Sequence, residues 1–118
     1  MDKPTFSIVI TTKDRLESLK RLIESIEKYT EDYELIVVND ASTDGTLEWL
    51  AKQSIRYGQY RGPQAYQSIS YTASIPVATA WNLGVEVANG EFIQILNDDM
   101  EVTEGWLTSQ KQIYDYLT

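Results

Sequence analysis

Two adjacent carboxylates, Asp98 and Asp99, directly follow a largely apolar run at residues 92–96, and Asn97 stands before them. Neighbouring carboxylates repel one another, so a chain that places them at the end of a core strand is expected to bring a positive partner to face them. Carboxylate oxygens suit hard cations such as Mg²⁺ and Mn²⁺. The motif therefore predicts a divalent-metal site, the alternative being an acidic turn between a strand and a helix.

The residue types that are absent narrow the chemistry. The chain contains no cysteine and no histidine, which excludes disulfides, thiolate nucleophiles, imidazole catalysis and His-ligated zinc. Its net charge is −8, with 10 Lys and Arg against 18 Asp and Glu. That sign argues against a protein that grips DNA or RNA through phosphates, but it is compatible with one small anionic ligand held through a metal.

Length and hydropathy set the class of protein. The 118 residues, 42% of them apolar, suit a single domain over residues 1–118 with one core. No apolar run approaches the ~20 residues that span a bilayer, and no signal-peptide segment follows Met1. These features predict a soluble, cytoplasmic protein.

Hydrophobic periodicity predicts alternating strands and helices. Strands are expected at residues 6–10, 34–38, 67–72 and 91–96, and helices after residue 14, around residues 47–50, from Pro76 to Ala88 and from about Thr103 onward. Asp14 and Glu17 have the spacing of a capping box at the start of the first helix. Because the strands are apolar almost throughout, this order predicts a Rossmann-like α/β fold, a mainly parallel sheet with helices on both faces.

Open sheets of this kind bind ligands beyond the carboxyl ends of their strands. Three such ends carry polar clusters here, at residues 11–15, 39–42 and 97–99. A metal ion that bridges phosphate oxygens suits this edge, since Mg²⁺ usually takes only one or two protein carboxylates. Dinucleotide binding is disfavoured because neither G-x-G-x-x-G nor G-x-x-x-x-G-K-[ST] occurs in the chain.

Three segments, FSIVITTKDR, ELIVVNDASTDGT and ATAWNLGVEVANGEFIQILNDDMEVTEGWL, resemble in that order the N-terminal, nucleotide-sugar-binding half of family 2 glycosyltransferases. The resemblance covers nearly the whole chain except about residues 51–72. It implies a GT-A fold, a UDP- or dTDP-sugar donor, Mn²⁺ or Mg²⁺ as cofactor, and inverting transfer of a hexose to a hydroxyl of a saccharide or other acceptor.

The resemblance also implies roles for individual residues. Asn97-Asp98-Asp99 matches the D-x-D motif, in which the middle residue approaches the ribose and Asp99 binds the metal on the diphosphate. Asp40 matches the aspartate that holds the base, and Thr11 lies where the family also touches the base. Asn82 is assigned to the donor site as well, the alternative being a plain surface position on a helix.

This sequence departs from the family pattern at several positions. Asn97 replaces the first aspartate of D-x-D and removes one charge, Lys13 stands where an aromatic residue is frequent, and Pro76 where a glycine is frequent. The acceptor half with its catalytic base is expected downstream of D-x-D, yet the later carboxylates Glu101, Glu104 and Asp115 do not match its motif. The catalytic residue is therefore unassigned, and the chain looks truncated relative to a full GT-A domain.

Other interpretations of the same residues remain open. The chain is alternatively a catalytically incomplete module that binds a nucleotide sugar, or an assembly domain that buries an open sheet edge by self-association or against a partner chain. A nucleotidyltransferase is a weaker alternative, because TTKDR is not a glycine-rich phosphate loop. Lys13 and Arg15 are expected to be solvated charges, Ser42 to cap a helix, and Trp49, Trp81 and Trp106 to be packing residues.

Overall fold

The computed structural model describes residues 4–57 and 62–107. Its elements are β1 (Phe6–Thr12), α1 (Leu16–Tyr29), β2 (Tyr33–Asp40), α2 (Thr46–Tyr57), β3 (Ala65–Tyr71), α3 (Val77–Val87) and β4 (Phe92–Asn97). The alternation of strands and helices predicted from the periodicity is confirmed as far as β4. Most of the helix expected after Thr103 lies outside the described residues. Within the described ranges, no helix is long and apolar enough to cross a bilayer.

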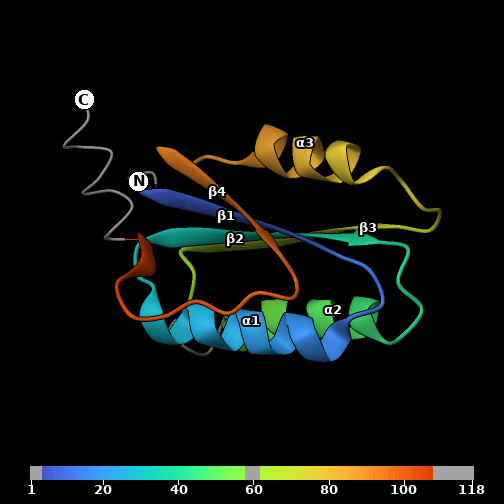
Figure 1. Cartoon of the computed structure of the whole chain (residues 1–118), viewed down its shortest axis with the longest axis horizontal. Coiled ribbons are helices and arrows are strands. Elements are labelled where there is room, and N and C mark those ends of the chain that lie inside the picture. The colour runs from blue at the N-terminus through green and yellow to red at the C-terminus, as the bar shows by residue number, and fades with distance from the viewer. Residues whose placement is uncertain (1–3, 58–61, 108–118) are drawn as a thin grey trace.

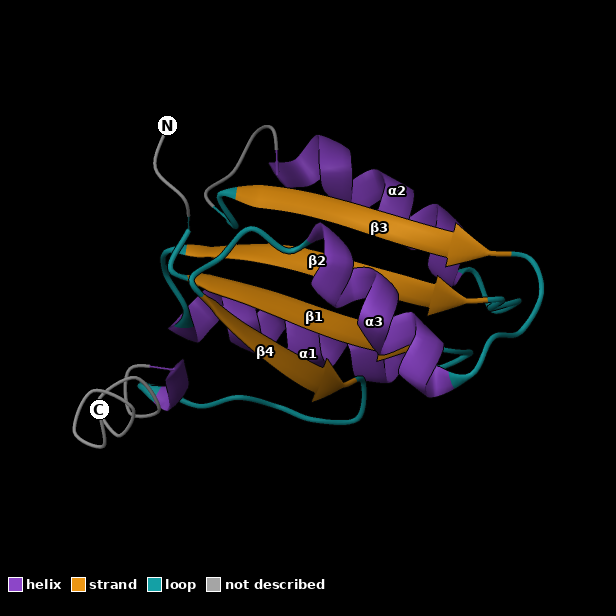
Figure 2. Cartoon of the chain, turned by 90° about the horizontal axis from the view of Figure 1, so that it is seen from above, coloured by secondary structure: helices purple, strands orange, loops and turns teal. Residues whose placement is uncertain are grey.

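The four strands form one sheet in the order β3-β2-β1-β4, and every pair is parallel. Helices α1 and α2 cover one face and α3 covers the other, as Figures 1 and 2 show. The predicted Rossmann-like sheet is therefore confirmed. In its register Thr11 lies beside Val38 on one side and Asn97 on the other, which brings the polar strand ends to one edge.

The two central strands supply most of the core. Side chains alternate across a strand, so Ile8 and Ile10 pack under α1 while Val9 faces α3. Helix α1 buries Leu19, Leu22, Ile23 and Ile26, all at most 1% exposed. This is the apolar stripe expected of an amphipathic helix on a sheet. Trp49 and Trp106 pack against the same core, as predicted.

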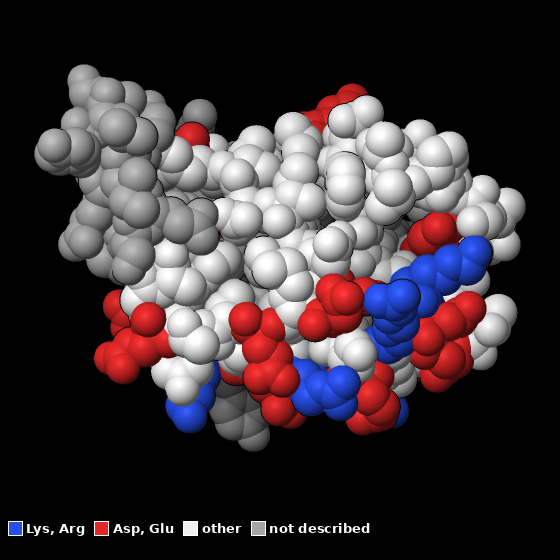
Figure 3. All heavy atoms as spheres, viewed as in Figure 1, with Lys and Arg blue, Asp and Glu red and all other residues white. Residues whose placement is uncertain are grey.

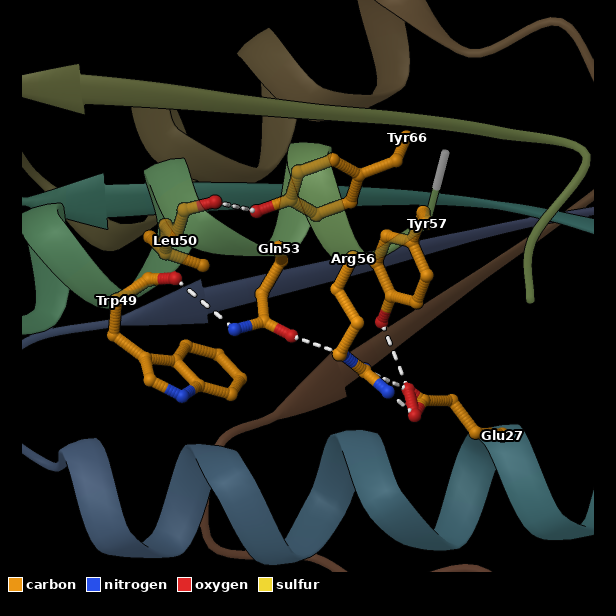
Figure 4. Close-up of polar contacts among 7 residues, drawn as sticks. All are labelled: Glu27, Trp49, Leu50, Gln53, Arg56, Tyr57 and Tyr66. Carbon is orange, nitrogen blue, oxygen red and sulfur yellow. Dashed lines mark hydrogen bonds and ion pairs between the residues drawn. The ribbon is translucent and has the colours of Figure 1, made fainter. Parts of the chain in front are cut away.

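A polar network joins α1 to α2 (Figure 4). Arg56 donates to both oxygens of Glu27 and, 2.7 Å away, to Oε1 of Gln53. The Tyr57 hydroxyl donates to Glu27 over 3.0 Å, and burial, with the Glu27 charge second, raises the pKa of Tyr57. Tyr66 of β3 reaches back to the Leu50 carbonyl at 2.9 Å. Because these bonds run between helices and sheet, they fix α2 relative to α1.

Helix α3 sits close to the sheet because Gly84 has no side chain. A Cβ atom at this position would lie 2.3 Å from Cγ1 of Val9. At the end of the helix the amide of Asn89 donates to the carboxylate of Glu34, a 2% exposed residue that also accepts from Ser7. These contacts hold the α3–β4 connection against β1 and β2.

Candidate functional site

A pocket with a volume of about 360 Å³ opens at the carboxyl ends of β1, β2 and β4. Its lining includes Thr11, Asp40, Asn97, Asp98 and Asp99, five of the six positions predicted for the donor and the metal. Figure 3 shows basic and acidic side chains lying against one another at this end of the molecule. The sheet topology thus brings together residues from three segments that are far apart in sequence.

Asn82, the sixth predicted position, is exposed on α3 and is not part of the pocket lining. The helix contributes Val77 and Ala80 instead. Ala80 faces the sheet at 1% exposure, and a residue two positions later points roughly 200° away around the helix. The structure therefore does not bring Asn82 to the pocket.

Asp98 is held inside the edge of the sheet. It is 6% exposed, and its Oδ2 accepts a hydrogen bond of 2.9 Å from the hydroxyl of Thr12, which is itself buried. Its other oxygen lies 3.5 Å from Nη1 of Arg15. Thr12 was not singled out from the sequence, although its position directly after Thr11 on β1 was the available signal.

Asp99 differs from its neighbour in exposure. Its side chain is 61% exposed and lies 3.9 Å from Arg15. Within the described ranges, no group of three or more His, Cys, Asp or Glu residues gathers to hold a metal by itself. The carboxylate ligands present still fit a metal that binds together with a diphosphate, because one open carboxylate, phosphate oxygens and water can complete the coordination that Mg²⁺ prefers.

Asp40 is engaged by the segment that connects β3 to α3. Its Oδ1 accepts from the amide of Ile75 at 2.9 Å, and the Ser74 hydroxyl lies 3.4 Å from Oδ2. Lys13 in turn donates to Ser74 over 2.9 Å, so it is bonded as well as exposed. A carboxylate has about four lone-pair sites, and Asp40 therefore keeps capacity for a further donor.

The loops after β1 and β2 are tied together by reciprocal hydrogen bonds. The amide of Asp14 donates to Ser42 Oγ at 3.0 Å, and the amide of Thr43 donates to Asp14 Oδ1 at 2.6 Å. The amide of Leu16 donates to Asp44 at 3.0 Å. The Thr46 hydroxyl, and after it the Leu16 amide, hold the pKa of Asp44 below its usual value.

Two capping predictions are wrong for this reason. Arg15, not Asp14, is the N-cap residue of α1, and it makes no side-chain cap. Asp14 has a φ of +52° and turns its carboxylate to the neighbouring loop. Ser42 likewise bonds Asp14, and Asp44 bonds the first residue of α2, Thr46. A cap supplied by another loop leaves no local sequence signal.

Arg15 is the positive partner that the adjacent carboxylates require. Its guanidinium contacts Asp98 at 3.5 Å and Asp99 at 3.9 Å, although its side chain is 58% exposed. Arg15 is exposed, as expected of a solvated charge, and in addition makes an ion pair that the sequence did not predict. The end of β4 thus presents two carboxylates, one buried and one open, and the Arg15 guanidinium contacts both.

Solved structures share this fold. Staphylococcus aureus TarS residues 1–349 superpose with a TM-score of 0.78 at 21% identity, covering 95% of this chain and 32% of that one. The mannosyltransferase PcManGT from Pyrobaculum calidifontis, solved with GDP-Man and Mn²⁺, gives a TM-score of 0.74 at 22% identity, covering 91% and 31%. At these identities the likeness shows the fold, and it confirms the predicted GT-A architecture.

Curated relatives are more similar in sequence. An uncharacterized protein of Sinorhizobium fredii is 34% identical over 89% of this chain and 11% of its own length. The abequosyltransferase RfbV of Salmonella typhimurium is 30% identical, and the GalNAc(5)-diNAcBac-PP-undecaprenol beta-1,3-glucosyltransferase of Campylobacter jejuni 29%, each over 92% of this chain and 34% of the relative. The chain thus spans about a third of the two transferases and about a tenth of the uncharacterized protein.

The match to a family model covers almost the whole sequence. Residues 7–115 match the family described as Glycosyl transferase family 2. This range includes β1 except Phe6, all of β4 and every residue that lines the pocket. The chain belongs to glycosyl transferase family 2.

Proposed function

We propose that residues 1–118 form one donor-binding domain and that the pocket at the carboxyl edge binds a nucleotide-diphosphate sugar. One observation carries the proposal: Asp40 and the adjacent pair Asp98 and Asp99 come from separate segments and line a single pocket with Thr11. Relatives that transfer abequose or glucose, and a neighbour that holds GDP-Man, support a sugar nucleotide as the ligand. UDP and dTDP sugars are the proposed donors.

Each lining residue has a proposed role. Thr11 and Asp40 contact the base, and the spare lone pairs of Asp40 accept from a ring N–H. Asn97 and Asp98 lie where they can meet the ribose and the sugar, and Thr12 fixes the orientation of Asp98. Asn82 remains a prediction without support from the pocket lining.

Asp99 is the proposed ligand of Mn²⁺ or Mg²⁺. It has the exposure that metal entry requires, whereas Asp98 already accepts a hydrogen bond from Thr12. The metal would supply Lewis-acid stabilisation of the departing diphosphate. The chain's own contribution is to hold the donor in place between the base-binding and the metal-binding carboxylates.

The proposed reaction is inverting transfer of a hexose to a hydroxyl of a saccharide or other acceptor. Such a transfer needs a base that deprotonates the acceptor. Glu101 and Glu104 are exposed and do not line the pocket, and Asp115 lies outside the described residues. No residue of the chain is therefore assigned as the base, and donor binding is the part of the activity that we propose for these residues.

Calorimetric titration with UDP and dTDP, each with and without Mn²⁺, tests the proposal. Asp99→Ala should abolish the metal-dependent part of binding and leave the fold intact, since the side chain is 61% exposed. Glu101→Ala is the matched control, because it removes an exposed carboxylate outside the pocket lining. Equal binding of UDP plus Mn²⁺ by Asp99→Ala and the parent would show that the metal assignment is wrong.

An assembly role is the second candidate, and the exposed side of β4 favours it. Ile93 and Ile95 on this edge strand are 44% and 38% exposed, and α3 beside them carries only one charged residue, Glu86. In Figure 3 the surface around α3 is almost without charge. A molar mass that rises with concentration, together with no affinity for either nucleotide, would support self-association through this surface.

A further inference from the structure

Arg15 faces the carboxylate that the metal would need. Its Nη1 atom lies 3.5 Å from Asp98 Oδ1 and 3.9 Å from Asp99 Oδ2. Asp98 has a second donor in Thr12, 2.9 Å away, but Arg15 is the only cation for which a contact with Asp99 is recorded in the described part of the chain. The guanidinium therefore neutralises the open carboxylate.

The backbone around Arg15 is fixed by contacts that do not involve its side chain. The amides of Asp14 and Leu16, on either side of it, donate to Ser42 and Asp44 in the next loop, each at 3.0 Å. These anchors fix the backbone position from which the Arg15 side chain extends. The loops after β1 and β2 thus place the positive charge of Arg15 beside Asp98 and Asp99.

A divalent ion and a guanidinium cannot both neutralise the same open carboxylate at full strength, because two cations a few ångströms apart repel one another. The pocket already contains Lys13 and Arg15 against Asp40, Asp98 and Asp99, a local excess of one negative charge. A diphosphate would add negative charge and so restore the demand for a metal. Metal binding should therefore depend on the nucleotide.

We propose that Arg15 is an internal competitor of the divalent metal at Asp99, so that the free protein binds Mn²⁺ weakly and the metal enters together with the nucleotide diphosphate. The inference rests on the proposed function, since it concerns the same site. It assigns Arg15 the role of controlling when the metal binds at Asp99. It needs no further residue beyond those in the two loops and at the end of β4.

The test is Mn²⁺ binding in the absence of nucleotide, measured by electron paramagnetic resonance of free Mn²⁺. An exposed ion pair is worth roughly 1.4- to 5-fold in an equilibrium constant, so the loss of the Arg15–Asp99 pair predicts that Arg15→Gln binds Mn²⁺ roughly 1.4- to 5-fold more tightly than the parent. Arg21→Gln is the matched control. It removes the same charge from α1, the helix that begins directly after Arg15, and it lies outside the pocket lining, where its side chain donates to Ser18.

Two further variants sharpen the result. Arg15→Gln combined with Asp99→Asn should lose the gain, and Arg15→Lys, which keeps the charge, should bind Mn²⁺ within about twofold of the parent by the same ion-pair magnitudes. The proposal is overturned if Arg15→Gln and the parent bind Mn²⁺ equally, if Arg21→Gln gains as much, or if the gain survives the Asp99 substitution. Circular dichroism checks that each variant is folded.

The same proteins separate this inference from the proposed function. If Arg15→Gln gains Mn²⁺ affinity through Asp99 while no protein binds UDP or dTDP, the competition stands and the nucleotide proposal fails. If the parent binds UDP in a metal-dependent way but Arg15→Gln shows no gain without nucleotide, the nucleotide proposal stands and the competition fails.

Discussion

Gly84→Ala tests whether the close packing of α3 on β1 stabilises the fold. The added Cβ would lie 2.3 Å from Cγ1 of Val9, a residue with no exposed surface. Carbon atoms pack best about 3.5–4.0 Å apart, so the helix must move by roughly 1 Å or more, or Val9 must leave its rotamer. The same helix supplies Val77 and Ala80 to the pocket wall.

The expected cost follows from two opposing terms. Overpacking a buried contact typically costs ~1–3 kcal/mol. Replacing glycine by alanine inside a helix contributes about 1 kcal/mol of stability through the lower entropy of the unfolded chain. Because the clash is with a buried side chain between two packed elements, we expect the first term to win, with a net destabilisation of up to ~2 kcal/mol.

A double-mutant cycle with Val9→Ala isolates the contact. Removing Cγ1 and Cγ2 of Val9 leaves its Cβ at 3.4 Å from the new methyl group, close to ordinary contact. In that background Gly84→Ala should stabilise the protein by up to about 1 kcal/mol, because only the helix term remains. The sign of the effect of Gly84→Ala on stability therefore reverses, with a coupling energy of ~1–3 kcal/mol, the overpacking term itself.

Urea unfolding followed by circular dichroism measures all four proteins. A destabilisation by Gly84→Ala that is the same in both backgrounds would refute the reasoning, because the cost would not come from Val9. A neutral or stabilising effect in the parent would show that α3 does not press on β1 at this point. In either case the argument that glycine sets the distance between α3 and the sheet would have to be abandoned.

Two other predictions concern the same layers. Gly90→Ala should destabilise the protein more than Gly84→Ala. Its Cβ would lie 2.6 Å from the backbone nitrogen of Ser7, and a backbone atom cannot change rotamer to relieve the clash as a side chain can. Urea unfolding of the two variants under the same conditions checks this order. Burial raises the pKa of Tyr66 to about 12 from 10.0, so the folded state keeps a proton that the unfolded state loses, and stability falls as the pH rises from 10 towards 12. Tyr66→Phe should lower stability by about 1 kcal/mol at neutral pH, because the hydrogen bond to the Leu50 carbonyl is lost. It should also make stability fall less steeply between pH 10 and 12, by up to about 1.4 kcal/mol per pH unit. An unchanged dependence of stability on pH would contradict the raised pKa of Tyr66.

The sequence predicted the elements because periodicity is a local property. Near-continuous apolar runs at residues 6–10 and 34–38 indicated strands covered on both faces, and they are the two central, buried strands. Helical spacing of Leu19, Leu22, Ile23 and Ile26 indicated the buried face of α1. Parallel pairing followed from the alternation of strands and helices, and it placed the polar strand ends at one edge.

Other features depend on which segments meet. Glu34 occupies a strand position that looked like the polar start of an apolar run, yet it is 2% exposed because Ser7 and the end of α3 bond it. Asn82 shares a short segment with Ala80, but the phase of the helix turns it away from the pocket. Neither the burial of Glu34 nor the orientation of Asn82 could be predicted from the neighbouring residues alone.

By itself, then, the sequence determined the strands, the helices, the parallel sheet and the edge where Asp40, Asp98 and Asp99 gather, because each follows from local hydrophobic pattern and from the direction of the chain. Only the tertiary structure decided that Asp44 caps α1 from another loop and that Arg15 lies over Asp98 and Asp99. The physical reason is that these contacts join loops that only the strand order β3-β2-β1-β4 makes neighbours.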